Sequence, residues 1–191
     1  MDLPQPRFSE TEIAQIARRI DRPIVLVGMM GVGKSSVGKR LATLLHWPFV
    51  DADDEIERSA RMTIPEIFAG FGEDYFRDGE RRVISRLLAD DCTQSVIATG
   101  GGAFCNEATR RLILDHAIAV WLDSDVDTLV ERTSRKDNRP LLRDGDPREI
   151  LGRLRDERAP HYEQAPIHVV SASGPHTHTV FRVLQGVSQW L

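Results

Sequence analysis

The residues that most constrain the fold are Gly28–Ser35, which read GMMGVGKS and match the pattern G-x-x-x-x-G-K-[ST] in full. A short β-branched run, Ile24–Val27, precedes them, and apolar residues at helical spacing follow as far as Leu45. Glycines between a strand and a helix let backbone N–H groups curl around a phosphate, and the helix N-terminus adds its positive dipole end. We therefore predict an α/β fold that binds a nucleotide at this loop.

The side chains of the loop have roles that follow from phosphate chemistry. We expect Lys34 to reach the β- and γ-phosphates and Ser35 to place its hydroxyl on Mg²⁺, which bridges those phosphates during transfer. A chance glycine turn is the alternative, and the strand–loop–helix setting disfavours it. GTPases and ATP-driven motors share such a loop, so it leaves the reaction open. The predicted ATP contacts in this segment are Gly31, Val32, Gly33, Lys34, Ser35 and Ser36.

Four further short apolar runs are typical of buried strands, and stretches of helical character separate them: Phe49–Val50, Ser95–Ala98, Ile118–Leu122 and Ile167–Val170. Strands that alternate with helices predict a parallel sheet covered by helices. A chain of 191 residues, 41% of them hydrophobic, suits one compact domain with an apolar core. We place this domain at residues 23–191, after an N-terminal extension at 1–22.

The two ends of the chain also carry helical patterns. Ile13, Ile16 and Ile20 recur at helical spacing, which predicts a short amphipathic helix, and we favour its packing on the domain over contact with a partner. A last helix is predicted over Val180–Trp190. Between Ser134 and Pro147 the chain is charged and poor in apolar residues, which indicates a mobile surface segment.

Composition excludes several classes of protein. A formal net charge of −4 gives no overall basic field to hold a nucleic-acid backbone. No apolar run approaches the ~20 residues of a membrane helix, and the N-terminus lacks the layout of a secretory signal. The chain has two cysteines, Cys92 and Cys105, which we expect to be free thiols in a reducing cytoplasm.

Acidic residues gather after the second predicted strand, where parallel sheets hold ligands. Continued strand alternation would place Asp51 and Asp53 on the same side. One of them can support a metal-bound water, and the other can accept a hydrogen bond from a substrate hydroxyl and assist its deprotonation. Asp54 and Glu55 are better explained as acids in the first turn of a helix, where they favour the dipole.

Two other features are unusual for a purely structural role. Phe76-Arg77 follows a glycine-containing turn, and Gly100–Gly102 follows the third predicted strand directly. Three consecutive glycines cost ordering entropy, which is justified where the backbone passes close to a ligand. A plain tight turn explains them equally well, and isolated arginines such as Arg77 are usually solvated.

These motifs together resemble the shikimate kinase family from about Ile24 to Val170. The resemblance rests on GMMGVGKSS, the DAD of Asp51–Asp53, FGEDYFRDGE around Arg77, ATGGGA, the RPLL of Arg139–Leu142 and ERAPHYEQ around Arg158. It implies a three-layer fold similar to nucleoside monophosphate kinases, with a five-stranded parallel sheet, a substrate-binding segment at about 51–80 and a lid at about 133–148. The implied reaction transfers the ATP γ-phosphoryl to the 3-hydroxyl of shikimate, a step of chorismate and aromatic amino acid biosynthesis.

The resemblance also implies roles for single residues. It places Asp53 on the ring hydroxyls of shikimate and Arg77 and Arg158 on its carboxylate, with Lys34, Asp53 and Arg139 as the catalytic set. Arg139 would reach the ATP phosphates from the lid, Asp51 would help hold Mg²⁺ through water, and Arg132 would contact the adenine side. The shikimate contacts implied are Asp53, Arg77, Gly100, Gly101, Gly102 and Arg158. Members of the family are commonly monomeric, and we expect the same here.

Other functions remain to be weighed. A related kinase acting on gluconate or a nucleoside monophosphate is disfavoured by the joint presence of DAD, FR and GGG, and a GTPase by the lack of N-K-x-D. A catalytically silent nucleotide-binding module, docking through its N-terminal helix, is disfavoured by the intact Lys34 and Asp53. We interpret Cys105 as inert, and His176 and His178 as part of a solvated loop rather than a metal site.

Overall fold

The computed structural model describes residues 8–89, 94–134, 145–171 and 176–191. Its centre is a five-stranded parallel sheet with the order β2-β3-β1-β4-β5. The strands are β1 (Ile24–Val27), β2 (Phe49–Asp51), β3 (Val96–Ala98), β4 (Ile118–Asp123) and β5 (Ile167–Val170). Every predicted strand is confirmed, and β2 and β4 each extend one residue further, to Asp51 and Asp123.

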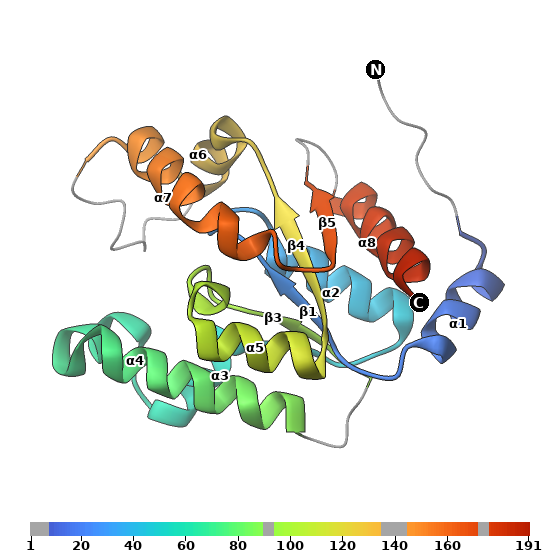
Figure 1. Cartoon of the computed structure of the whole chain (residues 1–191), viewed down its shortest axis with the longest axis horizontal. Coiled ribbons are helices and arrows are strands. Elements are labelled where there is room, and N and C mark those ends of the chain that lie inside the picture. The colour runs from blue at the N-terminus through green and yellow to red at the C-terminus, as the bar shows by residue number, and fades with distance from the viewer. Residues whose placement is uncertain (1–7, 90–93, 135–144, 172–175) are drawn as a thin grey trace.

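Helices cover both faces of this sheet (Figure 1). On one face lie α1 (Glu10–Arg19), α2 (Lys34–Leu45) and α8 (His176–Trp190), and on the other lie α5 (Glu107–His116) and α7 (Pro147–Tyr162). The central strand β1 is fully buried, as a parallel strand between two helical layers should be. Phe104 of the 3₁₀ turn η1 (Ala103–Cys105) adds to this core.

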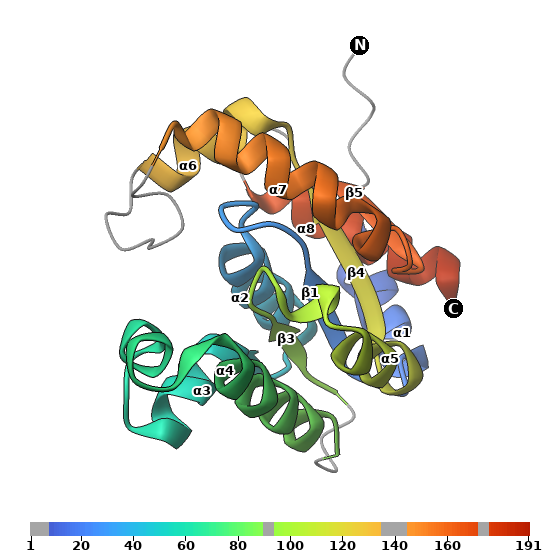
Figure 2. The ribbon, with the colours of Figure 1, turned by 60° about the vertical axis from the view of Figure 1, so that its left-hand side comes forward.

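Two helical pairs extend beyond the carboxyl ends of the strands. Figure 1 and Figure 2 show α3 (Ala52–Ala60) and α4 (Ile64–Ala89) on one side of the segment between β1 and α2, and α6 (Val126–Ser134) and α7 on the other. The first pair has a small apolar core of its own, formed by Ile56, Ile67, Phe76 and Val83. Gly72, with φ 82° and ψ 177°, interrupts the helical geometry of α4 four residues before Phe76. The segment between β1 and α2 therefore faces side chains from both pairs.

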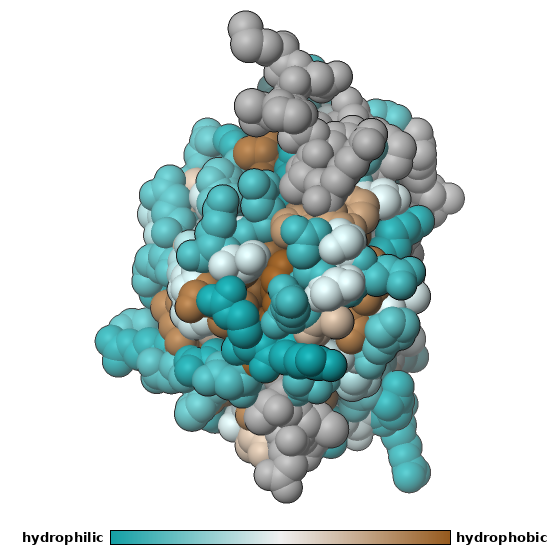
Figure 3. Space-filling view, turned by 90° about the vertical axis from the view of Figure 1, so that its right-hand side faces the viewer, coloured by the Kyte–Doolittle hydropathy of each residue, from teal (hydrophilic) through white to brown (hydrophobic). Residues whose placement is uncertain are grey.

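The N-terminal helix packs on the domain. α1 starts with a capping box in which Ser9 and Glu12 exchange hydrogen bonds, and it buries Ile13, Ile16 and Ile20 beside α2. On this side of the molecule the apolar residues at the surface are separated by hydrophilic ones (Figure 3). The apolar stripe of α1 thus faces inward.

The last helix begins earlier than predicted. α8 starts at His176 rather than at Val180, and it buries Val183, Leu184 and Val187. His176 and His178 therefore lie in the first turn of a helix, and the interpretation as a solvated loop is wrong. The charged segment after Ser134 falls largely on residues 135–144, which lie outside the described residues together with Arg139.

Candidate functional site

The loop after β1 has the backbone that phosphate binding requires. Gly28, Gly31 and Gly33 have φ values of 133°, 82° and 101°, which side chains other than glycine rarely allow. A Cβ at Gly28 would also lie 2.2 Å from the carbonyl oxygen of Leu122. The buried Lys34 ammonium donates to the carbonyl oxygens of Gly28 at 2.7 Å and Met29 at 2.9 Å. Its charge is therefore held inside the curve of the loop.

The predicted metal-binding pair is brought together. The Ser35 hydroxyl donates to Oδ2 of Asp51 at 2.6 Å, although 16 residues separate them. Asp51 also caps α3, because its Oδ1 accepts from the Asp53 backbone N–H at 3.1 Å. A hydroxyl and a carboxylate are the hard oxygen donors that Mg²⁺ prefers, so the pair fits this ion. In the described part of the chain no cluster of three or more acidic, histidine or cysteine ligands forms, so a metal here would need nucleotide oxygens or water as further ligands.

Asp53 reaches the site for a different reason than the sequence suggested. Together with Asp54 and Glu55 it stands in the first turn of α3, so the expected strand alternation is wrong for Asp53 and the helix-start interpretation is confirmed for the other two. Burial raises the pKa of Asp53 to about 6, and the neighbouring carboxylates of Asp51 and Glu80 act in the same direction. Lys34 opposes them. This carboxyl group thus lies close to the protonated Lys34 and titrates near neutrality.

Arg77 is oriented by an acid that the sequence analysis missed. Its Nη1 donates to Oε2 of Glu80 at 2.7 Å, and Glu73 holds the other side of the guanidinium at 3.2 Å. Glu80 is 1% exposed, and its second oxygen has no hydrogen-bond partner within the described residues. The signal was present in the sequence, because Arg77 and Glu80 share a helix face at i, i+3. Arg77 is therefore a half-buried side chain fixed by two carboxylates, and not a solvated surface arginine.

The three glycines after β3 pass between these side chains. A Cβ at Gly100 would lie 2.8 Å from Oδ1 of Asp53, and one at Gly102 would lie 2.5 Å from Nη2 of Arg77. At Gly101 a Cβ would lie 3.2 Å from the backbone nitrogen of Met30 in the phosphate loop. A tight turn alone does not require these three contacts. The glycines are needed because the backbone closely approaches both the loop and the acidic and basic side chains.

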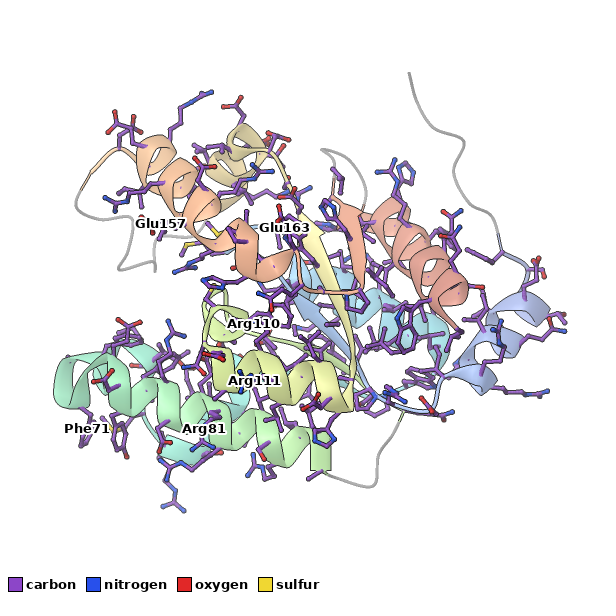
Figure 4. The ribbon with its side chains drawn as sticks, viewed as in Figure 1. Phe71, Arg81, Arg110, Arg111, Glu157 and Glu163 are labelled. Carbon is purple, nitrogen blue, oxygen red and sulfur yellow. The ribbon has the colours of Figure 1, made fainter. Side chains whose placement is uncertain are left out.

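Arg158 and Tyr162 reach the same glycines from α7. Nη1 of Arg158 donates to the Gly101 carbonyl oxygen at 3.3 Å, and the Tyr162 hydroxyl donates to the same oxygen. Tyr162 is buried and stacks on Trp121, and burial raises its pKa. Sequence analysis gave Tyr162 no role, although it follows Arg158 by one helical turn. In Figure 4, Arg110 of α5 points toward this end of α7, where it donates to Gln164 at 3.0 Å.

The nucleotide side of the loop has two neighbours. Arg132 of α6 donates to the Val32 carbonyl oxygen at 3.1 Å, so its guanidinium lies beside the loop, and its contact with adenine stays a prediction. Cε1 of His176 would lie 3.0 Å from a Cβ at Gly33, so the first turn of α8 packs against the loop. Burial, Arg132 and Arg40 lower the pKa of His176. Cys105 is partly buried and burial raises its thiol pKa, in line with an inert residue.

Comparison with known proteins identifies the family. The family model for shikimate kinase matches residues 30–187. A shikimate kinase of Novosphingobium aromaticivorans is 65% identical over 186 residues, which cover 96% of each chain. This chain belongs to the shikimate kinase family. A shikimate kinase of Caulobacter vibrioides is 54% identical over 168 residues, 88% of this chain and 83% of its own.

Solved structures of the shikimate kinase family share the fold. The shikimate kinase from Acinetobacter baumannii, solved in complex with shikimate, superposes with a TM-score of 0.77 at 35% identity and covers 91% of this chain and 96% of its own. A gluconokinase from Sinorhizobium meliloti reaches a TM-score of 0.60 at 21% identity, which shows a common fold and no more. Because kinases with different substrates share this fold, the residues that bind the phosphoryl acceptor must distinguish them.

Proposed function

We propose that this chain transfers the γ-phosphoryl group of ATP to the 3-hydroxyl of shikimate and releases shikimate 3-phosphate and ADP. One observation carries the proposal: Asp53, Arg77 and Arg158 surround Gly100–Gly102, next to the phosphate loop. A carboxylate and two guanidinium groups suit a small acceptor that bears hydroxyls and one carboxylate. Membership of the shikimate kinase family supports the same substrate.

The loop binds and orients the nucleotide. Its backbone N–H groups and the N-terminus of α2 surround the phosphates, and Lys34 leaves the carbonyls of Gly28 and Met29 to contact the β- and γ-oxygens. Ser35 and Asp51 would hold Mg²⁺, Asp51 through water, and the ion would neutralise charge on the transferred group. Arg132 would contact the adenine side, and its hydrogen bond to the Val32 carbonyl oxygen of the loop supports this role. Because phosphoryl transfer has a loose transition state, this positioning and charge stabilisation supply most of the rate.

The acceptor is held on the other side of the glycines. Arg77 and Arg158 bind its carboxylate, and Asp53 accepts a hydrogen bond from the reacting hydroxyl. With a pKa of about 6 Asp53 is mostly ionised at neutral pH, so it can orient the hydroxyl and take its proton as the phosphoryl group arrives. Glu80 keeps the guanidinium of Arg77 in place. Arg139 lies outside the described residues, and its assignment to the transferred phosphoryl group rests on the RPLL motif.

The setting of the reaction is also part of the proposal. We expect a cytoplasmic enzyme that acts as a monomer on two small substrates and does not bind nucleic acid. Across the described ranges, every helix is too short or too polar to cross a bilayer.

An ADP-release assay with ATP and Mg²⁺ tests the function. Shikimate, gluconate, quinate and AMP are compared as acceptors, and Asp53→Asn serves as the site variant. We expect turnover with shikimate, and a fall in kcat of about 10²-fold or more in Asp53→Asn, as for loss of a positioned acid–base group. ATP binding without turnover on any acceptor would favour the silent nucleotide-binding module, and preference for gluconate or AMP would favour a sibling kinase.

A further inference from the structure

Helix α7 is attached to the sheet at a second point, one turn before Arg158. The guanidinium of Arg155 donates two hydrogen bonds to the carboxylate of Asp123, from Nη2 to Oδ2 at 2.9 Å and from Nε to Oδ1 at 3.3 Å. Asp123 is the last residue of β4, and its side chain is only 12% exposed. A forked arginine–carboxylate contact fixes direction as well as distance.

The carboxylate of Asp123 is itself held firmly. The backbone N–H of Ser124 donates to Oδ1 at 2.8 Å, and Nε2 of His168 on β5 lies 3.5 Å from Oδ2. The His168 ring stacks on Trp121 of β4, with 3.9 Å between centroids and 11° between planes. The stack fixes the His168 ring on the strand paired with β4, so the Asp123 carboxylate is held between the Ser124 N–H and a positioned imidazole. The Arg155 guanidinium thus donates to a carboxylate whose position is fixed.

Arg155, Arg158 and Tyr162 follow one another along one face of α7, at i, i+3 and i+7. Arg155 joins that face to the end of β4, while Arg158 and Tyr162 join it to the carbonyl oxygen of Gly101 after β3. These two attachment points, one at the end of β4 and one at the turn after β3, oppose rotation of the helix about its axis. Rotation is the movement that would turn Arg158 away from the glycines.

We propose that Asp123 and Arg155 form a clamp that positions Arg158 for the carboxylate of the acceptor. The clamp rests on the proposed role of Arg158, and Arg155 itself touches no substrate. Displacement of a binding group by about 1 Å can cost up to two orders of magnitude in rate. The acceptor side of this enzyme therefore depends on an ion pair that lies at the edge of the site, beyond the residues that contact shikimate.

Arg155→Met tests the clamp, because it removes the guanidinium and keeps an apolar stem. We expect the KM for shikimate to rise by about five- to tenfold while the KM for ATP stays within about twofold. Asp123→Asn should have a similar effect, and the double variant should be no worse than either single one, since both remove the same contact. Arg155→Lys should recover part of the loss, because lysine supplies charge without the fork.

Arg153→Met is the matched control on the same helix. Arg153 is 69% exposed, and its nitrogen lies 3.8 Å from the carboxylate of Glu157, which is itself 59% exposed. Such a pair contributes little, so both KM values should stay at the wild-type level. Melting temperatures are measured in parallel. A merely structural ion pair would lower the melting temperature and leave KM unchanged, because KM does not depend on how much enzyme is folded.

The outcomes separate the clamp from the proposed function. Arg158→Lys should raise the KM for shikimate in an otherwise normal enzyme, and if it does not, the role of Arg158 is wrong. If Arg158→Lys has this effect and Arg155→Met does not, the clamp is wrong and the function stands. In an Arg158→Lys background, Arg155→Met should add less than about twofold, because the clamp acts through Arg158. If the two substitutions instead raise the KM for shikimate independently, so that their factors multiply in the double variant, the clamp is wrong.

Discussion

The two sides of the site are built in different ways. On the proposed nucleotide side, a single stretch of nine residues, Gly28–Ser36, supplies the glycines, the lysine and the serine, and the positive φ angles of its glycines shape the backbone of the loop. On the acceptor side, Asp53, Arg77 and Arg158 come from α3, α4 and α7 and meet at glycines that follow β3. The nucleotide side is formed by the local backbone geometry of one segment, and the acceptor side is formed by the packing of three helices.

The two sides also differ in the groups that surround their charges: backbone carbonyls on the nucleotide side, and charged side chains on the acceptor side. The Lys34 ammonium is held by neutral carbonyl oxygens of its own loop. The acceptor side instead gathers carboxylates and guanidinium groups at a half-buried position, and burial together with like charges raises the pKa of Asp53. Side chains held by other side chains can be displaced by changes at a distance. We therefore expect substitutions on the nucleotide side, and of Asp53 at the reacting hydroxyl, to act on the chemical step, and those that disturb Arg77 or Arg158 to act on shikimate binding.

The largest effect is expected at Lys34. Lys34→Met keeps a long apolar stem and removes the charge that stabilises the transferred phosphoryl group, so kcat should fall by about 10³-fold or more. The KM for shikimate should change by less than about threefold, because the proposed contacts of Lys34 are with the nucleotide phosphates, and those that hold the shikimate carboxylate are Arg77 and Arg158. Lys39→Met, on the exposed face of the same helix, should keep wild-type kcat. Steady-state kinetics that show an equally large change in shikimate KM would break the division into two sides.

A smaller effect is expected at Gly102. The Cβ of Gly102→Ala would meet the guanidinium of Arg77 at 2.5 Å, so Arg77 must move, and the KM for shikimate should rise by roughly tenfold. The KM for ATP should not change. Gly79→Ala is the control, since Gly79 lies in α4 near Arg77 and a Cβ there meets no atom within 4 Å. A rise in ATP KM for Gly102→Ala would show that the glycines serve both substrates.

This division also explains how much could be predicted from the sequence. The phosphate loop and its roles could be read directly, because its geometry is encoded in consecutive residues whose glycines need positive φ. The five strands could be read because each is a short apolar run between stretches of helical character, although β2 is only partly buried and β5 buries every second residue. On the acceptor side, spacing alone could not show that Asp53, Arg77 and Arg158 converge, and only the resemblance to a family proposed it.

The errors have physical causes too. Strand alternation predicts Asp53 on a continued strand, but Asp51 caps a helix there, and the cap brings Asp53 to the site. The polar neighbours of His176 predict a loop, whereas its ring packs on Gly33, a tertiary contact that local polarity does not reveal. Glu80 and Tyr162 lie inside the motifs that resemble the family, but the sequence does not show that they are buried, and their role follows from that burial.

The smallest effect is expected far from both sides, at Ser9. In α1 the Ser9 hydroxyl accepts from the Glu12 backbone N–H, and the Glu12 carboxylate accepts from the Ser9 N–H at 2.7 Å. Ser9→Ala removes half of this box and should lower the melting temperature by about 2–4 °C. Kinetic constants should stay unchanged, because α1 packs beside α2 through buried isoleucines that Ser9→Ala leaves in place. Thermal unfolding measures the change in melting temperature, and ATP titration of the same sample measures the KM for ATP. A raised KM for ATP would mean that α1 supports the helix that carries Lys34, and the nucleotide side would then depend on packing as the acceptor side does.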